Sequence, residues 1–503
     1  MSASAAQASP PLDLVIVGAG LSGIGMAAHM EQLCPDRRYA VIERRERIGG
    51  TWDLFRYPGV RSDSDMHTLG FVFEPWRHEK SIADGPSILE YLDRIADERG
   101  IRQHIRFGTQ VLSADWDSRT ALWRLEVDGP DGRSSVEARF VMLASGYYDY
   151  DDPYDAAIPG KDSFGGRIVH PQFWPADLDY AGKRVVVIGS GATAVTVVPA
   201  MANTAAHVTM LQRTPTWMAS RPAKDGIANL MRRFLPEMLA YRLTRFKNIK
   251  LQSVAFHGAR KAPEKARAYL TKQAQKLLGT HYRAADFTPP YDPWTQRLCL
   301  IPDGDLFAAI RAGKAEVVTD HIDRIDATGV LLKSGKHLDA DVIVTATGLR
   351  MTMAGKIVTR IDGVTVDWSQ HYYYKGCMFS NVPNLAAVFG YLNASWTLRA
   401  DIISDYLCRT FNLMKARGAA VVTPALPAGH DLVEDTGAFN LQSGYIDRSR
   451  HLLPKSATDM RWRLNHDYVR DRAWMKGDPI EDGVLRFDPA PVPLPEEVLE
   501  AAE

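Results

Sequence analysis

The chain has 503 residues, a formal net charge of zero, 46% hydrophobic residues and 24% charged residues. This length predicts more than one domain, the composition is typical of a folded globular protein, and the absence of net positive charge argues against nucleic acid as a partner. With no apolar run near the roughly 18 residues of a membrane-spanning helix and no secretory pattern in residues 1–12, we expect a cytoplasmic enzyme.

The first predicted unit is a strand at residues 14–17 that leads into the glycine motif GAGLSG at 18–23. A helix from about 21 to 33 and a second strand at 39–42 follow, and the second strand ends at Glu43. This order of strand, glycine loop, helix, strand and acid is typical of a dinucleotide-binding fold. Three glycines in an ordinary loop are the alternative, but they would not explain the whole order.

The residues of this motif have distinct expected roles. Gly18 allows a tight turn, Gly20 allows the backbone to approach a pyrophosphate, and Gly23 allows the helix to pack on the strand. Ser22 belongs to the helix N-terminus, whose N–H groups and dipole attract phosphate. Glu43 is placed to accept a hydrogen bond from a ribose 2′-hydroxyl, so the first site fits FAD or NAD rather than NADP.

A second unit of the same kind begins with a strand at 184–188 and the motif GSGATA at 189–194. After its helix, at about 192–203, the next strand at 207–211 leads to Arg213 instead of an acid. A guanidinium there would pair with a 2′-phosphate, which predicts NADPH; the alternative is a surface charge at a strand end. The residues predicted to bind this cofactor are Gly189, Ser190, Gly191, Ala192, Thr193, Ala194, Arg213 and Thr214.

Two dinucleotide sites with different ribose chemistry predict a flavoprotein that takes hydride from NADPH. That class includes disulfide reductases, amine oxidases and monooxygenases. Disulfide reductases need two close cysteines beside the flavin, whereas the four cysteines here are far apart in the sequence and show no metal-ligand spacing: Cys34, Cys299, Cys377 and Cys408. The sequence therefore argues against a disulfide reductase and predicts no metal site.

The segment FGGRIVHPQFWP at 164–175 resembles the fingerprint of the type I Baeyer–Villiger monooxygenases, which are class B flavoprotein monooxygenases. Five residues match: Phe164, Gly166, His170, Trp174 and Pro175. Trp174 is expected to anchor a connector between domains, and His170 to exchange hydrogen-bond partners as they shift. Five further stretches resemble the branch that includes the mycobacterial ethionamide-activating monooxygenase: 49–65, 146–154, 291–307, 344–348 and 390–398.

This resemblance implies an NADPH- and O2-dependent enzyme containing FAD. Such enzymes convert ketones to esters or lactones through a C4a-peroxyflavin, and members of this branch also S-oxygenate sulfides and thioamides. The implied partners are a small ketone or thio-compound and O2. The first alternative is a flavin-containing monooxygenase that mainly oxidises nitrogen or sulfur, and the second is a non-catalytic NADPH-binding redox sensor.

The resemblance also assigns residue roles. The family's active-site arginine maps onto Arg297, and the carboxylate that orients it maps onto Asp63, which with Arg61 and Ser62 is expected to contact the nicotinamide side. A structural ion pair and an ordinary loop acid are the alternatives for Arg297 and Asp63. Gln296 departs from the family pattern, since many members have a lysine there that helps to bind the 2′-phosphate.

Other positions are expected to surround the cofactor. Those after the Gly49-Gly50 turn match isoalloxazine contacts, and Val111 matches a position whose backbone holds the adenine. A later loop, from Asn393 to Trp396 and including Ser395, is expected to shape the pocket. The predicted flavin contacts are Gly50, Thr51, Trp52, Asp53 and Leu54.

The predicted fold class is α/β, with two Rossmann-like dinucleotide-binding domains and a helical insertion. The FAD domain is expected to comprise residues 10–147 and 345–503, the NADPH domain residues 153–220 and 293–342, and the helical insertion residues 221–292. The stretch DVIVTATG at 341–348 predicts a buried strand that returns to the first sheet.

The predicted helical region is strongly basic. Residues 221–283 contain 15 Lys and Arg against 3 Asp and Glu, a net charge of +12. A solvated helical face over the cofactor cleft is the simpler interpretation, and we expect it over the alternative, a basic amphipathic surface resting on anionic lipid.

Overall fold

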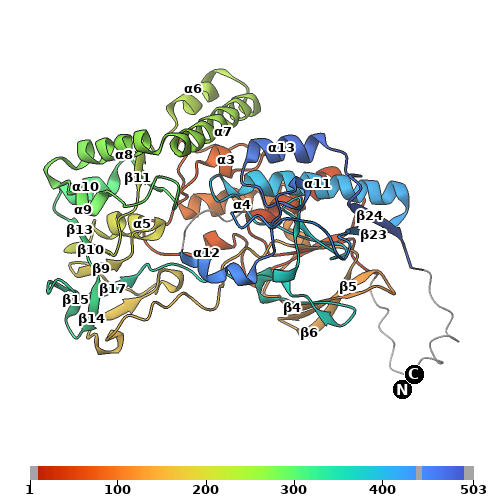
Figure 1. Cartoon of the computed structure of the whole chain (residues 1–503), viewed down its shortest axis with the longest axis horizontal. Coiled ribbons are helices and arrows are strands. Elements are labelled where there is room, and N and C mark those ends of the chain that lie inside the picture. The colour runs from red at the N-terminus through yellow and green to blue at the C-terminus, as the bar shows by residue number, and fades with distance from the viewer. Residues whose placement is uncertain (1–9, 438–443, 492–503) are drawn as a thin grey trace.

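The computed structural model describes residues 10–437 and 444–491 and contains two parallel sheets at the centres of two neighbouring units (Figure 1). The first sheet has the order β22-β7-β1-β2-β3, and every neighbouring pair is parallel. Its strands are β1 (Leu14–Val17), β2 (Tyr39–Ile42), β3 (Ile105–Arg106), β7 (Val141–Leu143) and β22 (Leu385–Ala387). Because β1, β2 and β7 are buried on both faces, their sequences are uninterrupted apolar runs.

Helices enclose this sheet. Helix α1 (Leu21–Leu33) follows β1 directly and packs against α11 (Trp396–Arg417) and α4 (Gly85–Glu98). Ten consecutive residues of α1, from Leu21 to Met30, are buried, so this helix has no polar face. A helix that is apolar all round is typical of a position between a sheet and a second layer.

A second, mostly antiparallel sheet extends the first unit. Its order is β19-β18-β4-β5-β6, and its core includes Trp116 and Trp123, whose rings lie 5.5 Å apart. The strands are β4 (Gln110–Asp117), β5 (Leu122–Gly129), β6 (Gly132–Ala138), β18 (Val358–Ile361) and β19 (Val364–Thr365). The C-terminal part of the chain adds α12 (Gly444–Ser449), α13 (Tyr468–Gly477), β23 (Ala419–Pro424) and β24 (Leu485–Pro489).

The other parallel sheet has the order β13-β10-β9-β17-β8. Its strands are β8 (Arg167–Val169), β9 (Arg184–Ile188), β10 (His207–Gln212), β13 (Ala315–Thr319) and β17 (Val342–Thr345). Helix α5 (Ala192–Met201) follows β9, as the second glycine motif predicts. The meander β14 (Ile322–Asp326), β15 (Gly329–Leu332) and β16 (His337–Asp339) lies beside this sheet.

The prediction that the strand at 341–348 returns to the first sheet is wrong. That strand is β17, which pairs in parallel with β9 on one side and β8 on the other. A four-residue apolar run indicates a central parallel strand but carries no information on which of two such sheets it enters. The chain leaves β17, turns at Gly348 (φ +113°) and rejoins the first sheet only at β22.

The basic region forms helices, as predicted. They are α6 (Gly226–Phe234), α7 (Glu237–Lys261), α8 (Pro263–Leu278) and the short α9 (Ala284–Phe287). The helical region is interrupted at Pro236 and before Pro263. Proline favours the first turn of a new helix, because it lacks an N–H and has a fixed φ. The chain returns through β12 (Cys299–Pro302), which pairs with β11 (Met218–Arg221), and through α10 (Asp305–Arg311). In Figure 1, α6, α7 and α8 lie along the upper edge of the molecule.

Candidate active site

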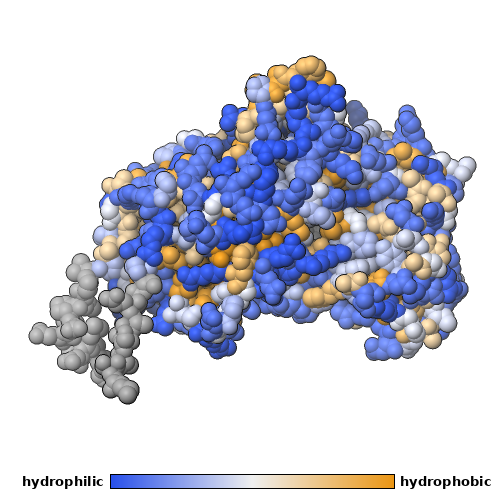
Figure 2. Space-filling view, turned by 180° about the vertical axis from the view of Figure 1, so that it is seen from behind, coloured by the Kyte–Doolittle hydropathy of each residue, from blue (hydrophilic) through white to orange (hydrophobic). Residues whose placement is uncertain are grey.

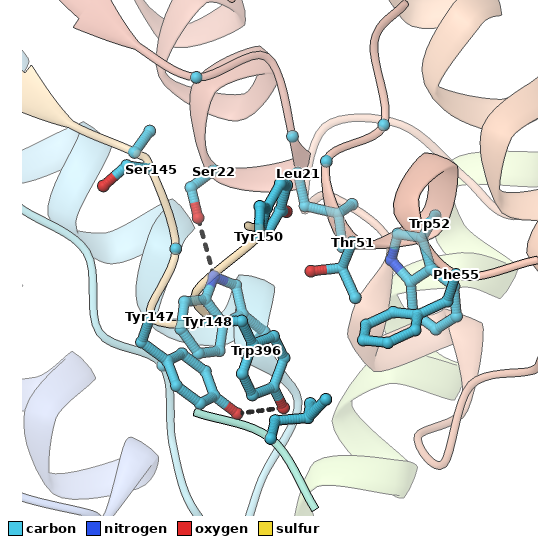
Figure 3. A pocket seen from close by; sticks show the side chains of 18 of the residues that line it. Leu21, Ser22, Thr51, Trp52, Phe55, Ser145, Tyr147, Tyr148, Tyr150 and Trp396 are labelled. Atoms are coloured by element: carbon cyan, nitrogen blue, oxygen red, sulfur yellow. Dashed lines mark hydrogen bonds between the residues drawn. The ribbon is translucent and has the colours of Figure 1, made fainter. Parts of the chain in front are cut away.

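A cavity of about 330 Å³ lies at the carboxyl ends of the first sheet's strands and extends to the second unit. Open α/β sheets bind ligands at this edge. Segments from both units line the cavity, including the glycine loop after β1, the end of β2, the loop at 60–64, the helix N-terminus at 192–196 and Arg297. Figure 3 shows the aromatic side chains that gather around it.

The first glycine loop is tightly enclosed. Gly18 has φ +103°, and a Cβ there would lie 2.7 Å from the carbonyl oxygen of Ala144. A Cβ on Gly23 would lie only 1.8 Å from the carbonyl oxygen of Gly18, so the helix can approach the loop only without a side chain. Gly20 lines the cavity opposite Gly50.

Glu43 is 4% exposed and lines the cavity at the end of β2. Its carboxylate accepts hydrogen bonds from the backbone N–H of Ala19 (2.7 Å) and of Arg45 (2.8 Å). Burial raises the pKa of this carboxyl above its ordinary value, although the two N–H groups oppose the shift. Val111, with Thr109 and Gln110, lines the same cavity.

Asp63 and Arg297 meet in the cavity. The guanidinium Nη2 of Arg297 lies 2.9 Å from Oδ2 of Asp63, and both side chains are partly exposed, at 42% and 36%. Asp63 precedes the short helix α3 (Met66–Leu69), and Arg297 precedes β12. The structure thus brings together two residues, 234 positions apart in the sequence, that resemblance alone assigned to one site.

The neighbours of Asp63 have different partners. Arg61 forms an ion pair with Asp305, the first residue of α10, and this pair connects the two units. Ser62 donates from Oγ to the carbonyl of Ser64 (2.7 Å) and accepts from its N–H (2.9 Å). Both Arg61 and Ser62 line the cavity.

Three of the five predicted flavin contacts, Gly50, Thr51 and Trp52, line the cavity. Asp53 instead forms ion pairs with Arg45 (2.6 Å) and Arg56 (2.9 Å). The residues after Gly50 form one helical turn, α2 (Thr51–Leu54), so successive side chains point about 100° apart. Asp53 and Leu54 are therefore directed into the protein, which the linear sequence did not reveal.

Aromatic side chains form one wall of the cavity (Figure 3). Trp396, at the start of α11, donates from Nε1 to Oγ of Ser22 (2.8 Å). Its ring stacks on Tyr147, whose hydroxyl lies 2.7 Å from that of Tyr148. Both tyrosines belong to the stretch 146–154 that resembles the family, but neither was predicted individually; the dense aromatic run after Gly146 was the available signal.

Tyr57 is a further residue of the cavity that was not predicted from the sequence. It lines the cavity near Asp63, and desolvation raises the pKa of its hydroxyl to about 12. The only sequence signal for Tyr57 was its place in a stretch rich in aromatic residues and glycine, between the first glycine motif and Arg61.

In the later loop, Leu392, Ala394 and Trp396 face the cavity, while Ser395 hydrogen-bonds Thr68 instead (2.7 Å). The carbonyl of Asn393 accepts from Gln252 of α7 (3.2 Å).

The second glycine loop is more open. A Cβ on Gly191 would meet nothing within 4 Å among the described residues, whereas one on Gly189 would lie 2.3 Å from the carbonyl oxygen of Ala346. Of the residues predicted to bind NADPH, Ala192 and Thr193 line the shared cavity. The others are not among the described residues that line it: Gly189, Ser190, Gly191, Ala194, Arg213 and Thr214. Arg213 is exposed just beyond the end of β10, and Ser190 donates to the carbonyl of Thr214 (3.2 Å).

The segment 164–175 forms an edge of the second unit. Its strand β8 pairs with β17, and a Cβ on Gly166 would lie 2.3 Å from the carbonyl oxygen of Asp341. Nδ1 of His170 accepts from the N–H of Gln172 (3.2 Å), and its Nε2 lies 3.3 Å from the carbonyl oxygen of Gly348. Burial lowers the pKa of His170, so the neutral ring with its proton on Nε2 is favoured.

The cysteines lie away from the cavity lining. All four are buried and free. Cys34 and Cys408, far apart in the sequence, are neighbours in the fold, since Cys34 Sγ lies 3.6 Å from the carbonyl oxygen of Cys408. Neither residue lines the cavity within the described ranges, so neither is placed to exchange electrons with a cofactor there.

Two dinucleotide-binding folds that share one aromatic cavity define a flavoprotein oxidoreductase with a second nucleotide site. Residues 15–276 match the family described as pyridine nucleotide-disulphide oxidoreductase. The chain is 48% identical to the FAD-containing monooxygenase EthA of Mycobacterium tuberculosis, over 96% of this chain and 99% of that protein. It is 47% identical to the probable FAD-binding monooxygenase AlmA of Acinetobacter baylyi, over 95% and 96%. The chain therefore belongs to the FAD-containing monooxygenases.

Among solved structures, the fold is similar to an oxidised steroid monooxygenase bound to NADP, with a TM-score of 0.74 and 24% identity over 95% of this chain and 100% of that chain. A second similar fold is OTEMO in complex with FAD and NADP, with a TM-score of 0.73 and 22% identity over the same shares. The predicted fold class, the monooxygenase class and the FAD cofactor are confirmed by these relatives.

Proposed function

We propose that the protein is an NADPH- and O2-dependent Baeyer–Villiger monooxygenase that converts ketones to esters or lactones and also S-oxygenates sulfides and thioamides. The observation that carries this proposal is the ion pair of Arg297 with Asp63 in a cavity between two dinucleotide folds. The roles of the individual residues below belong to the same proposal.

The residues of the first unit suit FAD. Gly18, Gly20 and the N-terminus of α1 leave space and N–H groups for a pyrophosphate, and Glu43 retains acceptor capacity for a ribose hydroxyl. Val111 lines the same cavity and would hold the adenine, and Thr51 and Trp52 line it and would contact the flavin ring. When bound, FAD accepts hydride and activates O2.

Arg297 supplies a fixed positive charge where the oxygen chemistry takes place. Attack on a carbonyl needs an anionic oxygen, and the resulting adduct is itself an oxyanion, so a donor that stays protonated stabilises both. Asp63 holds the guanidinium in place by its 2.9 Å contact. The aromatic wall around Trp396 and Tyr147 gives one side of the cavity an apolar surface, which strengthens this electrostatic contribution.

The second unit supplies the reductant site. Its open loop at Gly191, the N–H groups at the start of α5 and the exposed guanidinium of Arg213 suit a dinucleotide with a 2′-phosphate. Arg61 and Ser62 of the first unit line the shared cavity where the two units meet, which supports their contact with the nicotinamide end of this dinucleotide.

The runner-up is a flavin monooxygenase that mainly oxidises nitrogen or sulfur. Heteroatom oxidation does not pass through an oxyanion adduct and does not need an anion-stabilising arginine, so Arg297 in the cavity favours ketone oxidation. The names of the relatives EthA and AlmA state a monooxygenase and FAD but no substrate.

Product analysis tests the proposal. The purified FAD-loaded protein is given NADPH, O2 and phenylacetone or 2-dodecanone, and we expect the ester by mass spectrometry. Arg297→Ala should retain FAD but lose ester formation by about 100-fold or more, as expected for removal of an oxyanion donor. Arg324→Ala, an exposed arginine on β14, is the matched control. Sulfoxide without ester would favour the runner-up, and normal ester yield from Arg297→Ala would refute the catalytic assignment.

A further inference from the structure

Helix α7 has a polar inner face. Tyr241 donates to the carbonyl of Phe71 (2.9 Å), and Asn248 donates to Oδ1 of Asp65 (2.9 Å). Arg245 is 5% exposed and donates to Oδ2 of Asp401 (3.0 Å) and to the carbonyl of Gly70 (2.7 Å). The helix is therefore held on the first unit by hydrogen bonds and a buried ion pair.

The outer face of the same helix is apolar. Its exposed residues include Leu239, Leu243, Phe246 and Val254, whose spacing places them within one stripe opposite the polar face. Phe246 and Val254 are 60% and 69% exposed. A helix of a globular protein normally has the reverse arrangement, with its apolar side toward the core.

Helix α6 continues this surface. Ile227, Leu230 and Phe234 follow at intervals of three and four, and Phe234, at the turn between α6 and α7, is 79% exposed. Figure 2 shows hydrophobic residues gathered at the top of the molecule, at the upper edge where Figure 1 places α6 and α7. Exposed apolar side chains scattered singly are ordinary, but a contiguous apolar ridge marks an interaction surface.

Basic side chains lie beside this ridge and, at Lys250, within it. Arg233, Arg242 and Lys250 are exposed, and the ammonium of Lys250 lies over the ring of Phe246 at 5.8 Å. The acids of the same two helices are already paired: Glu237 with Arg77 (2.8 Å), and Asp225, the residue before α6, with Lys247 (2.7 Å). The ridge and its border therefore present apolar groups and uncompensated positive charge.

We propose that the outer face of α6 and α7 is a docking surface for an anionic lipid bilayer. An amphipathic helix with basic flanks lies in the plane of the interface, with apolar side chains among the acyl chains and basic groups at the anionic headgroups. No helix in the described part of the chain is long and apolar enough to cross a membrane, and this mode of binding needs none. The proposal is independent of which substrate the cavity accepts.

The charge of the border favours lipid over a second copy of the chain. A twofold interface places the same patch on both partners, so Arg233, Arg242 and Lys250 would meet their own positive counterparts. Like charges brought together oppose association, whereas anionic headgroups attract the same groups. Helix α8 adds Lys265, Lys272 and Lys276 around the exposed Tyr269 on its outward side.

Vesicle co-sedimentation of the full-length FAD-loaded protein tests this proposal. We expect binding to phosphatidylcholine vesicles containing 30% phosphatidylglycerol, weaker binding to phosphatidylcholine alone, and a decrease with added salt. Phe234→Ser with Phe246→Ser should lower the partition coefficient by about tenfold or more. The matched control is Val364→Ser with Val433→Ser, which are exposed at 72% and 66% elsewhere on the surface.

A charge variant gives a second, independent measurement. Arg233→Gln, Arg242→Gln and Lys250→Gln together should weaken binding to the anionic vesicles by about tenfold or more. Replacement of Arg133, Lys314 and Lys333 by Gln removes the same charge elsewhere and should have little effect. If the phenylalanine variant loses FAD, the charge variant alone tests the proposal, because it changes only exposed ends of side chains.

Three results would overturn the proposal. The first is equal binding of the parent to both kinds of vesicle, or none to either. The second is unchanged binding of the charge variant. The third is concentration-dependent dimerisation without lipid that the phenylalanine variant abolishes, which would assign the ridge to a second copy. Sedimentation is measured without turnover, so failure of the proposed ketone oxidation and failure of lipid docking are separate results.

Discussion

The two glycine loops share one sequence pattern but differ in how the protein surrounds them. The first is enclosed by Ala144, Gly50 and the indole of Trp396, which hydrogen-bonds Ser22. The second is open at Gly191, and its ribose-side residue, Arg213, is exposed. Enclosure suits a cofactor that stays bound through many reactions, and an open site suits a co-substrate that must leave after each one.

The largest difference between the two loops should appear when each receives a methyl group. Gly23→Ala forces a Cβ against the Gly18 carbonyl and should weaken FAD binding by roughly 100-fold, equivalent to about 3 kcal/mol of overpacking. Gly191→Ala has ordinary backbone angles (φ −79°, ψ −174°) and open space, so the second loop should accept the methyl group without a shift and FAD in the first loop should stay bound. Visible absorbance of the purified proteins measures both, and equal FAD content in the two variants would contradict the comparison.

A variant at the junction of the two sites should have the next largest effect. Asp63→Asn removes the charge that holds Arg297, and ester formation should fall by about 10- to 100-fold, because a charged hydrogen bond contributes about 1.5–3 kcal/mol. FAD content should not change, since the first loop is untouched. Steady-state kinetics with phenylacetone measures the loss, and Asp323→Asn, a carboxylate on β14, is the control.

Removal of the Arg213 charge from the open second site should have a smaller effect than the two changes above. Arg213→Gln should raise the KM for NADPH by about tenfold while changing the KM for NADH little, because only NADPH carries the 2′-phosphate. The ratio of the two KM values is the measurement. An unchanged ratio would show that Arg213 is a surface charge and that other residues select the nucleotide.

The smallest expected effect concerns the connection between the two units. Because burial lowers the pKa of His170, the folded protein binds its proton less readily than the unfolded chain. Its contribution to stability is therefore present above the ordinary pKa of histidine, about 6.5, and is lost as the pH falls below it. The measurement is the melting temperature of the parent minus that of His170→Asn. This difference should decrease from pH 7.5 to pH 5, and a difference that does not change with pH would contradict the predicted effect of His170.

Local sequence was sufficient for the parts of the fold that depend on neighbouring residues. The strand, loop and helix around Gly18 to Gly23 lie at the predicted positions, since turn, packing and phosphate approach each require glycine at one place. The sheet that receives β17 was not predictable, because a buried apolar strand suits either parallel sheet.

The candidate site shows the same limit. The proximity of Asp63 and Arg297 could be expected only from family resemblance, since their separation in sequence gives no geometric information. Asp53 turned away from the cavity because α2 is a helical turn. Tyr147 became part of the cavity wall through its stacking on Trp396 of α11, and Tyr148 through its contact with Tyr147. Such orientations depend on tertiary packing.

The place of β17 also sets an order for folding during synthesis. The first sheet has four of its five strands by residue 143, and the late strand β22 adds only at its edge. The second sheet lacks a central strand until residue 345, so β8 and β9, made much earlier, have no direct pairing with each other in the final order. The first unit can therefore begin to assemble early in synthesis. The second unit can complete its sheet only after helices α6 to α9 and strand β17 have left the ribosome.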